Sequence, residues 1–404
     1  MAQLDREQAH HHTFSNHSSP TREAEPPLVL DDNHIDIDVD DDEDADEDLA
    51  EELIRFQARA ARTLFHQPRS ESDTLNSTQS LYDTDIEYLT IHERRYCENY
   101  SMPNDDAEQG RMQMLHDVYL DIFGGRLSLA PLQNPQKILD IGTGTGEWAI
   151  AMAELYPKAD VIGTDIAKIQ PTSVPCNVDF QIDDAEYVGG WTWTSNSFDL
   201  VHFRTMIGAF EDWNHIYREA YKTIKPGGYI EVVDLEIAAF PTYFPDNPMV
   251  VRWFNTFLEA TKIAGRPMTT DHLEPEVLAS AGFTNISATT KSIPCGVWPS
   301  ENQERKMGLH FMSVIYDGIE AVSLRLFVEQ LGWEPEDVTK LCKEVAKPIR
   351  ALAHNPQRCQ GYCMDVRVVV GRKPGGNELE VPDDKSTMGD SMRTVTNGDS
   401  SRGA

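Results

Sequence analysis

Three glycines at alternate positions are the residues of this chain with the clearest chemical meaning: Gly142, Gly144 and Gly146. They follow the apolar run Lys137–Ile141, which is typical of a buried parallel strand, and helical spacing returns over Trp148–Leu155. Strand, glycine turn and helix make up the first half of a nucleotide-binding βαβ unit. Glycine is needed there because the backbone bends sharply and a ligand approaches it where a Cβ would stand.

The residues around the turn indicate which ligand it binds. A dinucleotide-binding turn has a third glycine at the position where this chain has Glu147, and the Gly-Lys-Ser/Thr sequence of a phosphate-binding loop is missing. Asp140 and Glu147 instead place acids on both sides of the turn, which suits a cationic ligand without phosphate. S-adenosylmethionine carries a sulfonium and an α-amino group and no phosphate. The alternative is a glycine-rich turn in some other α/β protein.

Further strands that end in acids follow along the chain. The ranges predicted as strands are Asp160–Asp165, Val178–Ile182, Phe198–Arg204 and Tyr229–Glu236. Asp165 lies about twenty residues after the glycine turn, where a buried acid accepts hydrogen bonds from ribose hydroxyls. Asp184 follows the third strand, where an acid can accept from the adenine amino group. Because these strands alternate with helices such as Trp213–Ile224, they predict an open parallel sheet.

Five motifs, in this order, resemble those of the class I S-adenosylmethionine-dependent methyltransferases: DIGTGTGEWA, VIGTDIAKIQP, FQIDDAE, FDLVHFR and IKPGGYIEVVD. Ile169-Gln170-Pro171, Asp212-Trp213 and the run Met102–His116 are similar to segments of the fungal LaeA-like group. The chain departs from that group at Glu93, where the group usually has glycine. The resemblance covers roughly residues 80–373. It implies an α/β, Rossmann-like fold with a seven-stranded, mostly parallel sheet and helices on both faces.

The resemblance also implies a binding site for S-adenosyl-L-methionine. Its residues would be Asp140, Gly142, Thr143, Gly144, Gly146, Asp165, Ile166, Asp184, Ala185 and Arg204. Asp140 and the glycines would line the methionine and ribose portion, and Asp165 would take the ribose hydroxyls. Asp184 would reach the adenine amino group, with Ala185 packed nearby. Arg204 would face the methionine carboxylate or the methyl acceptor, and a surface salt bridge is the alternative for it.

The second half of the chain is expected to carry a helical insertion. Thr284–Ile293 and Gly361–Arg372 are predicted as the sixth and seventh strands, with a helical segment Glu301–Leu352 between them. Helices are also predicted over Pro245–Ala264 and His272–Ala281. The insertion forms either a lid over the substrate crevice or a packing element. Its aromatic and methionine side chains would then line an acceptor pocket or a core: Trp298, Met307, Phe311, Met312 and Tyr316.

Methyl transfer from a sulfonium is an in-line displacement, so the protein mainly positions the reactants and excludes water. An oxygen or nitrogen acceptor also loses a proton, and the general-base candidates near the crevice are His202, His215, Asp234 and Glu236. His202 lies inside a predicted strand, where a histidine is more often a core residue. His215 begins a surface helix and is expected to be exposed. No metal site is expected, because the six cysteines are scattered without zinc-ligand spacing.

The net charge of −32 is distributed unevenly over the 404 residues. Residues 31–52 hold fourteen acids and no Lys or Arg, so this run is expected to be disordered. It is either a solubilising tail or a site for a basic protein partner. The expected organisation is a disordered acidic region at 1–80, a methyltransferase domain at 81–373 and a disordered tail at 374–404. The negative charge argues against direct nucleic-acid binding.

No apolar stretch long enough to span a bilayer and no signal peptide is recognised, so an intracellular location without membrane contact, cytoplasmic or nuclear, is expected. Two functions stay open. The chain either methylates a small molecule in fungal secondary metabolism or is a LaeA-like regulator acting on or through protein partners in the nucleus. The helical insertion favours an enclosed small substrate, whereas the acidic run favours a partner-binding role. A nicotinamide dehydrogenase is disfavoured by the missing dinucleotide fingerprint.

Overall fold

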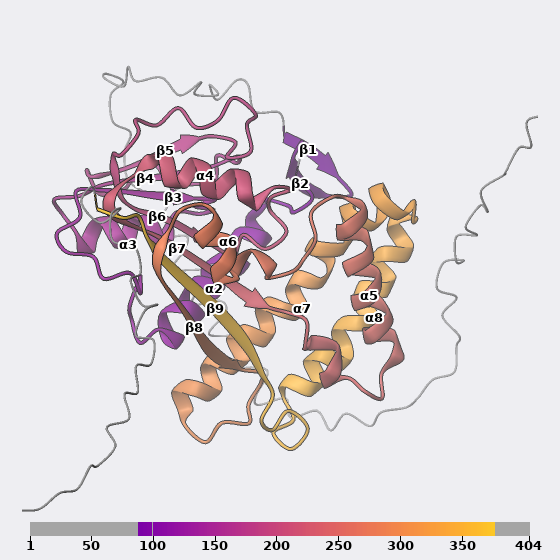
Figure 1. Cartoon of the computed structure of the whole chain (residues 1–404). Helices are drawn as coiled ribbons and strands as arrows, with labels where there is room; N and C mark the ends of the chain where they lie inside the picture. The colour runs from indigo at the N-terminus through magenta and orange to yellow at the C-terminus, as the bar shows by residue number, and fades with distance from the viewer. Residues whose placement is uncertain (1–87, 99, 376–404) are drawn as a thin grey trace, which may run out of the picture. The chain divides into compact units, whose positions relative to one another are not determined.

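Seven strands form one sheet in the computed structural model, which describes residues 88–98 and 100–375 (Figure 1). The order across the sheet is β5-β4-β3-β6-β7-β9-β8. The strands are β3 (Lys137–Ile141), β4 (Asp160–Asp165), β5 (Val178–Ile182), β6 (Phe198–Arg204), β7 (Ile224–Glu236), β8 (Thr284–Pro294) and β9 (Cys363–Arg372). Neighbouring strands from β5 to β7 are parallel, and β9 runs antiparallel to both β7 and β8. This mostly parallel, Rossmann-like sheet confirms the predicted fold class.

The first four parallel strands have the bounds that their apolar runs predicted. β3 and β6 lie side by side in the middle of the sheet, and almost all of their side chains are buried. A strand covered on both faces needs apolar residues at successive positions and not only at alternate ones. That requirement is why short continuous apolar runs located these strands correctly.

β7 begins earlier than predicted, at Ile224 and not at Tyr229. Lys225-Pro226-Gly227-Gly228, a sequence that predicts a helix stop and a turn, lies within this strand instead. Ile224 pairs with Phe198, and the register then shifts before Tyr229 pairs with Leu200. Such a bulge accommodates a proline and a left-handed glycine inside a strand, and Gly227 has φ +87°.

The helices that flank the sheet are α3 (Glu147–Leu155), α4 (Trp213–Thr223), α5 (Pro248–Ile263) and α6 (Pro275–Ser280), with short 3₁₀ turns η1 (Phe240–Tyr243) and η2 (Asp271–Leu273). The prediction of one helix over His272–Ala281 is wrong, because extended backbone at Glu274 separates η2 from α6. Glu274 is extended, with φ −68° and ψ 133°. Proline disfavours helical backbone at the residue before it and is tolerated at the first helical position, so a new helix starts there.

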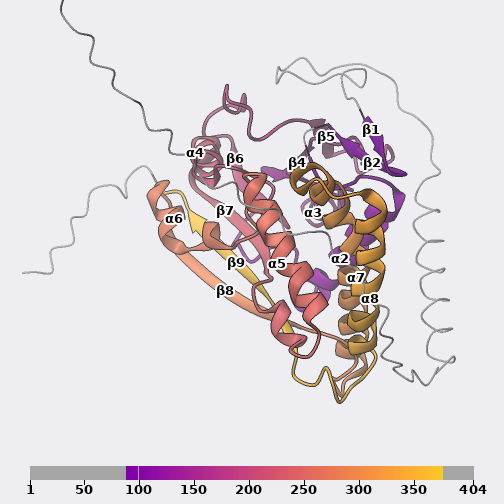
Figure 2. The same cartoon turned by 90° about the vertical axis from the view of Figure 1, so that its right-hand side faces the viewer.

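The predicted helical insertion between β8 and β9 is confirmed. It consists of α7 (Asn302–Leu331) and α8 (Pro335–Ala353). Buried residues of α8 recur every three or four positions: Val338, Leu341, Val345, Ile349 and Leu352. α7 packs against α8 and α5, and Figures 1 and 2 show these three helices beside one another at one side of the sheet.

The described chain begins with β1 (Tyr88–Ile91) and β2 (Arg94–Cys97), a separate two-stranded sheet, followed by α2 (Asp106–Ile122). The Asp105 side chain caps α2 by accepting a hydrogen bond from the Glu108 N–H. The acidic region 1–80 and nearly all of the tail 374–404 lie outside the described residues, so the three limits of the organisation stay predictions. No helix within 88–98 and 100–375 is both long and apolar enough to cross a bilayer.

Candidate cofactor and acceptor site

A cavity of about 1170 Å³ lies where the turns after β3, β4, β5 and β6 meet α2, α5 and α7. We call the residues contributed by the turns after β3, β4 and β5 the sheet wall, and those contributed by α5 and α7 the helical wall. Nine of the ten residues expected to bind the cofactor line this cavity: Asp140, Gly142, Thr143, Gly144, Asp165, Ile166, Asp184, Ala185 and Arg204. The tenth, Gly146, is not among the lining residues.

The glycine turn depends on left-handed backbone at all three glycines, with φ between +59° and +87°. Gly146 occupies the N-cap of α3, and a Cβ there would overlap the ring of Phe180. A Cβ on Gly142 would overlap the side chain of Met206. Gly146 therefore turns the chain into α3 without lining the cavity, whereas Gly142 and Gly144 line it.

Asp140 presents a carboxylate whose two oxygens are both held. Oδ2 accepts from the Thr143 hydroxyl at 2.7 Å, and Oδ1 lies 2.8 Å from His202 Nδ1. The residue is only 3% exposed, yet it lines the cavity. An acid held in this way can face the cationic part of a ligand without having to reorient.

Asp165 joins the end of β4 to the glycine turn. Oδ2 accepts from the Gly144 N–H at 2.8 Å, and Oδ1 accepts from the Ala167 N–H at 2.9 Å. Burial raises the pKa of the Asp165 carboxyl above its usual value, while these two N–H donors act in the opposite direction. Each carboxylate oxygen has a second lone pair, so the group can still accept from a ligand.

Asp184 and Ala185 follow β5 and lie on the same wall. Asp184 is exposed, and its Oδ1 accepts from the Glu186 N–H at 2.9 Å. Ala185 is buried, and Ile166 stands after β4 on the cavity wall. Small apolar side chains next to a carboxylate provide the mixed surface that a heterocycle with an amino group would meet.

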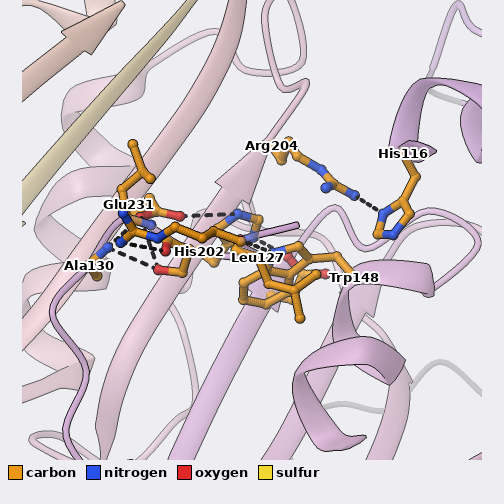
Figure 3. A network of polar contacts seen from close by, with 11 residues as sticks. His116, Leu127, Ala130, Trp148, His202, Arg204 and Glu231 are labelled. Carbon is orange, nitrogen blue, oxygen red and sulfur yellow. Dashed lines mark hydrogen bonds and ion pairs between the residues drawn. The ribbon is translucent and has the colours of Figure 1, made fainter. Parts of the chain in front are cut away.

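Arg204 is held by a neutral partner. Its Nη2 lies 2.9 Å from His116 Nδ1 (Figure 3). Its guanidinium stands over the ring of Tyr119. Burial and the Arg204 charge lower the pKa of His116 to about 3, so His116 is uncharged near neutral pH and accepts this hydrogen bond. Among the described residues no ion pair joins Arg204 to a carboxylate, so the surface salt bridge offered as its alternative is absent there.

The other cavity arginines already have carboxylate partners. Arg111 pairs with Glu108 and Arg325 pairs with Glu329. Arg266 pairs with Glu186 and Glu211. Within the described part of the chain, Arg204 is thus the cavity arginine without a carboxylate in contact with it, and it can donate hydrogen bonds to an anionic group of a ligand.

The helical wall is mainly apolar. Its residues include Trp253, Phe254 and Phe257 from α5 and Val314, Ile315, Ile319 and Val322 from α7. The five side chains expected to form this wall are absent from it: Trp298, Met307, Phe311, Met312 and Tyr316. Phe311 is fully buried in the protein core, and Tyr316 carries Arg350 over its ring. α7 thus lines the cavity with some of its side chains and packs in the core with others, so the insertion combines the two alternatives.

Of the four base candidates, only His215 lines the cavity. It is half-buried and not exposed as expected, and its Nε2 is buried without a hydrogen-bond partner among the described residues. Asp234 is fully buried and bonded to the Ile207 N–H and to His272. Leu235 lines the cavity, and because side chains alternate along a strand, Asp234 and Glu236 point to the other face of β7.

The segment before α2 also lines the cavity, which the sequence pattern did not indicate. Arg325 in α7 donates to three main-chain carbonyls of this segment, at Cys97 (2.7 Å), Glu98 (2.6 Å) and Tyr100 (3.0 Å). These contacts join positions more than two hundred residues apart, so no local periodicity reveals them. In the sequence, the only indication of this segment was the resemblance of the run Met102–His116 to the fungal LaeA-like group.

Metal ligands do not gather in the described part of the chain. No group of three or more His, Cys, Asp or Glu side chains within residues 88–98 and 100–375 is placed to hold a metal ion. The expectation that the reaction needs no metal stays a prediction.

Comparison with known proteins agrees with this geometry. A family model described as a methyltransferase domain matches residues 114–288. Methyltransferase pytC of Aspergillus terreus is 37% identical over 278 residues, which cover 67% of this chain and 85% of the relative. Secondary metabolism regulator laeA of Aspergillus fumigatus is 30% identical over 264 residues, covering 64% of this chain and 69% of the relative.

A solved structure of phosphoethanolamine N-methyltransferase 2 of Haemonchus contortus with S-adenosyl-L-methionine gives a TM-score of 0.34 at 16% identity. The match covers 69% of this chain and 54% of that one, and it carries no inference about the site. The sequence relatives, together with the glycine turn and its acids, are sufficient to assign the family. The chain belongs to the class I S-adenosylmethionine-dependent methyltransferases, within the fungal LaeA-like family.

Proposed function

We propose that this methyltransferase transfers the methyl group of S-adenosylmethionine to a small, largely apolar molecule in fungal secondary metabolism. One observation carries the proposal: the sheet wall and the helical wall enclose the same cavity. Pockets for one drug-sized ligand measure about 300–1,000 Å³. A cavity of about 1170 Å³ therefore has room for the cofactor and an acceptor side by side.

The cofactor is proposed to lie along the sheet wall. Asp140, with Thr143 and the glycine main chain, faces its methionine and ribose portion, and Asp165 accepts from the ribose hydroxyls. Asp184 accepts from the adenine amino group, with Ile166 and Ala185 packed beside the ring. Arg204, whose guanidinium donates to neutral His116 and forms no ion pair with a carboxylate among the described residues, is proposed to bind the methionine carboxylate.

The acceptor is proposed to lie against the helical wall. Apolar side chains of α5 and α7 exclude water and hold the acceptor in line with the sulfonium, which is the main contribution a protein makes to this displacement. When bound, S-adenosylmethionine would supply an activated methyl group on its sulfonium, so these side chains would need only to position the acceptor and exclude water.

Calorimetric titration with S-adenosylmethionine, S-adenosylhomocysteine and NAD tests the cofactor half of the proposal. We expect the first two to bind and NAD not to bind. A protein that binds NAD and neither of the others would overturn it. Radiolabelled S-adenosylmethionine added to a fungal extract then tests the acceptor half, because label should appear in a small, solvent-extractable product.

A regulatory role is the second candidate, and the similarity to secondary metabolism regulators favours it. In that case the methyl group goes to a protein, or the chain acts through protein partners, which its acidic region would bind. The same labelled extract separates the two functions, since label would then stay with precipitated protein. Cytoplasmic or nuclear location stays a prediction.

A further inference from the structure

Three buried polar side chains form a row across the centre of the sheet. Asp140 on β3 stands opposite His202 on β6, and His202 stands opposite Glu231 on β7. Residues opposed in this way share one face of a sheet, so their side chains are neighbours. They are 3%, 1% and 1% exposed, and of the three only Asp140 reaches the wall of the large cavity.

The His202 ring is fixed on one edge and on one face (Figure 3). Nδ1 lies 2.8 Å from Asp140 Oδ1, and because a carboxylate can only accept, Nδ1 carries the proton in this contact. The indole of Trp148 stacks on the ring with centroids 3.6 Å apart and planes 3° from parallel. Trp148 is itself held by a 2.7 Å hydrogen bond from its Nε1 to the Leu127 carbonyl.

The other edge of the ring faces a carboxylate without a hydrogen bond. Nε2 is 3.8 Å from Glu231 Oε1 and is buried with no hydrogen-bond partner among the described residues. The second oxygen of Glu231 accepts from the main-chain N–H groups of Leu129 and Ala130 and from Ser128. The two ring nitrogens therefore differ: Nδ1 makes the directional contact, and Nε2 only faces a charge.

We propose that His202 is a positioning residue for the cofactor, which acts by holding the Asp140 carboxylate toward the cavity. The inference rests on the proposed function, because it needs Asp140 to be a cofactor contact. Thr143 holds one oxygen of Asp140 from the glycine turn, and His202 holds the other from inside the sheet. A carboxylate fixed at both oxygens loses little freedom when a cationic ligand binds, and this preorganisation appears as affinity.

Two variants of His202 separate positioning from core packing. The side-chain nitrogen of asparagine can take the place of Nδ1, whereas that of glutamine reaches the place of Nε2. His202→Asn should thus keep the hydrogen bond to Asp140, and His202→Gln should lose it. We expect S-adenosylhomocysteine to bind the Asn variant within a few-fold of the parent, and the Gln variant about ten- to a hundredfold more weakly. Both variants lose the stacked ring, so their thermal midpoints should fall together.

His202→Leu provides a second comparison in case the Gln variant does not fold. Leucine matches the size of asparagine, has no donor, and leaves no buried donor unpaired. It should show the affinity loss expected for Gln. In a double-mutant cycle, Asp140→Leu removes the acceptor that His202 holds, so the double variant with His202→Gln should bind no more weakly than Asp140→Leu alone.

Equal affinity loss in the Asn, Gln and Leu variants, or additive losses in the cycle, would show that His202 only fills the core, and would overturn the inference. Failure of the proposed function is seen separately, in the parent protein. If the parent binds neither S-adenosylmethionine nor S-adenosylhomocysteine, the cofactor site is wrong and the role of His202 falls with it.

Discussion

The sheet wall and the helical wall of the cavity are specified by different parts of the polypeptide. On the sheet wall, glycine main chain and carboxylates from one short stretch of sequence face the cavity, and hydrogen bonds to main-chain N–H groups fix them. On the helical wall, apolar side chains from α5 and α7 do so, such as Phe257 and Ile319. Backbone geometry therefore sets one wall, and side-chain volume sets the other.

This difference indicates how the two halves of the site tolerate change. A left-handed glycine accepts no side chain without strain, so the sheet wall has few alternatives and suits a ligand that does not vary. Apolar side chains on a helix can change size with modest cost as long as total volume is kept. The helical wall, against which we propose that the acceptor lies, is thus the part of the site where substitutions could change acceptor preference.

The largest effect is expected within α7, where two neighbouring side chains have different roles. Phe311 is fully buried away from the cavity, so Phe311→Ala should lower the free energy of unfolding by about 3–5 kcal/mol. Ile315 lines the cavity, so Ile315→Ala should reduce methyl transfer with a smaller loss of stability. Chemical denaturation and S-adenosylhomocysteine titration of both variants make the comparison. Equal stability losses would mean that Ile315 contributes to the core as much as Phe311 does.

Next comes Gly146, on which the sheet wall depends. Gly146→Ala would pay about 1–2 kcal/mol for left-handed backbone and about 1–3 kcal/mol for overlap with the Phe180 ring. Gly110 in α2 is the matched control, because a Cβ there meets nothing within 4 Å. Gly110→Ala should stabilise the protein by about 0.5–1 kcal/mol. If both alanines have the same effect on the melting temperature, backbone geometry does not control this wall.

Variants of Asp165 and Asp184 test whether a buried acid of the sheet wall contributes more to cofactor affinity than an exposed one. Asp165→Ala would also leave two main-chain N–H groups without their acceptor, so Asp165→Asn, which keeps one acceptor, is the cleaner variant. It should weaken S-adenosylhomocysteine binding by about ten- to a hundredfold. Asp184→Asn should cost less affinity, because Asp184 is exposed and water competes for its oxygens. The reverse order, measured by calorimetry, would contradict the ribose assignment.

The smallest effect concerns His116, whose pKa is lowered to about 3 by burial and by Arg204. Below the usual pKa of about 6.5, the unfolded chain binds a proton that the native state does not. Stability should therefore fall as the pH drops, by about 2 kcal/mol at about pH 5 from this residue alone. His116→Asn keeps an acceptor for Arg204 and does not titrate, so its stability should fall less. The free energy of unfolding of parent and variant is measured by denaturation at a series of pH values. If both fall equally as the pH drops, His116 does not cause the loss of stability.

Local sequence patterns were sufficient to predict the parallel strands β3 to β6 and the acids at their ends. Apolar runs located β3 to β6, and the acids at the end of each strand meet at one edge because parallel strands end together. Nine of ten expected residues consequently share a cavity. Gly146 could not be separated from its neighbours, because its contact with Phe180 depends on how β5 packs.

The helical wall and the row of Asp140, His202 and Glu231 could not be predicted from local sequence patterns. Which face of α7 meets the cavity is decided by its packing on α8, α2 and α5, which come from distant parts of the chain. Asp140 and His202 are 62 positions apart and meet only through the register of β3 and β6. A sequence pattern identifies His202 as a strand residue, but the strand that lies beside it decides its partner.

Arg325 has a consequence for laboratory recombination between relatives. It holds the segment before α2 through the carbonyl oxygens of Cys97, Glu98 and Tyr100, groups that every amino acid carries. The hydrogen bonds to Glu98 and Tyr100 therefore do not depend on the side chains of these two residues, and depend only on the path of the backbone. Chimaeras that keep α7 with Arg325 from this chain and take the segment before α2 from a relative should therefore keep the contact intact.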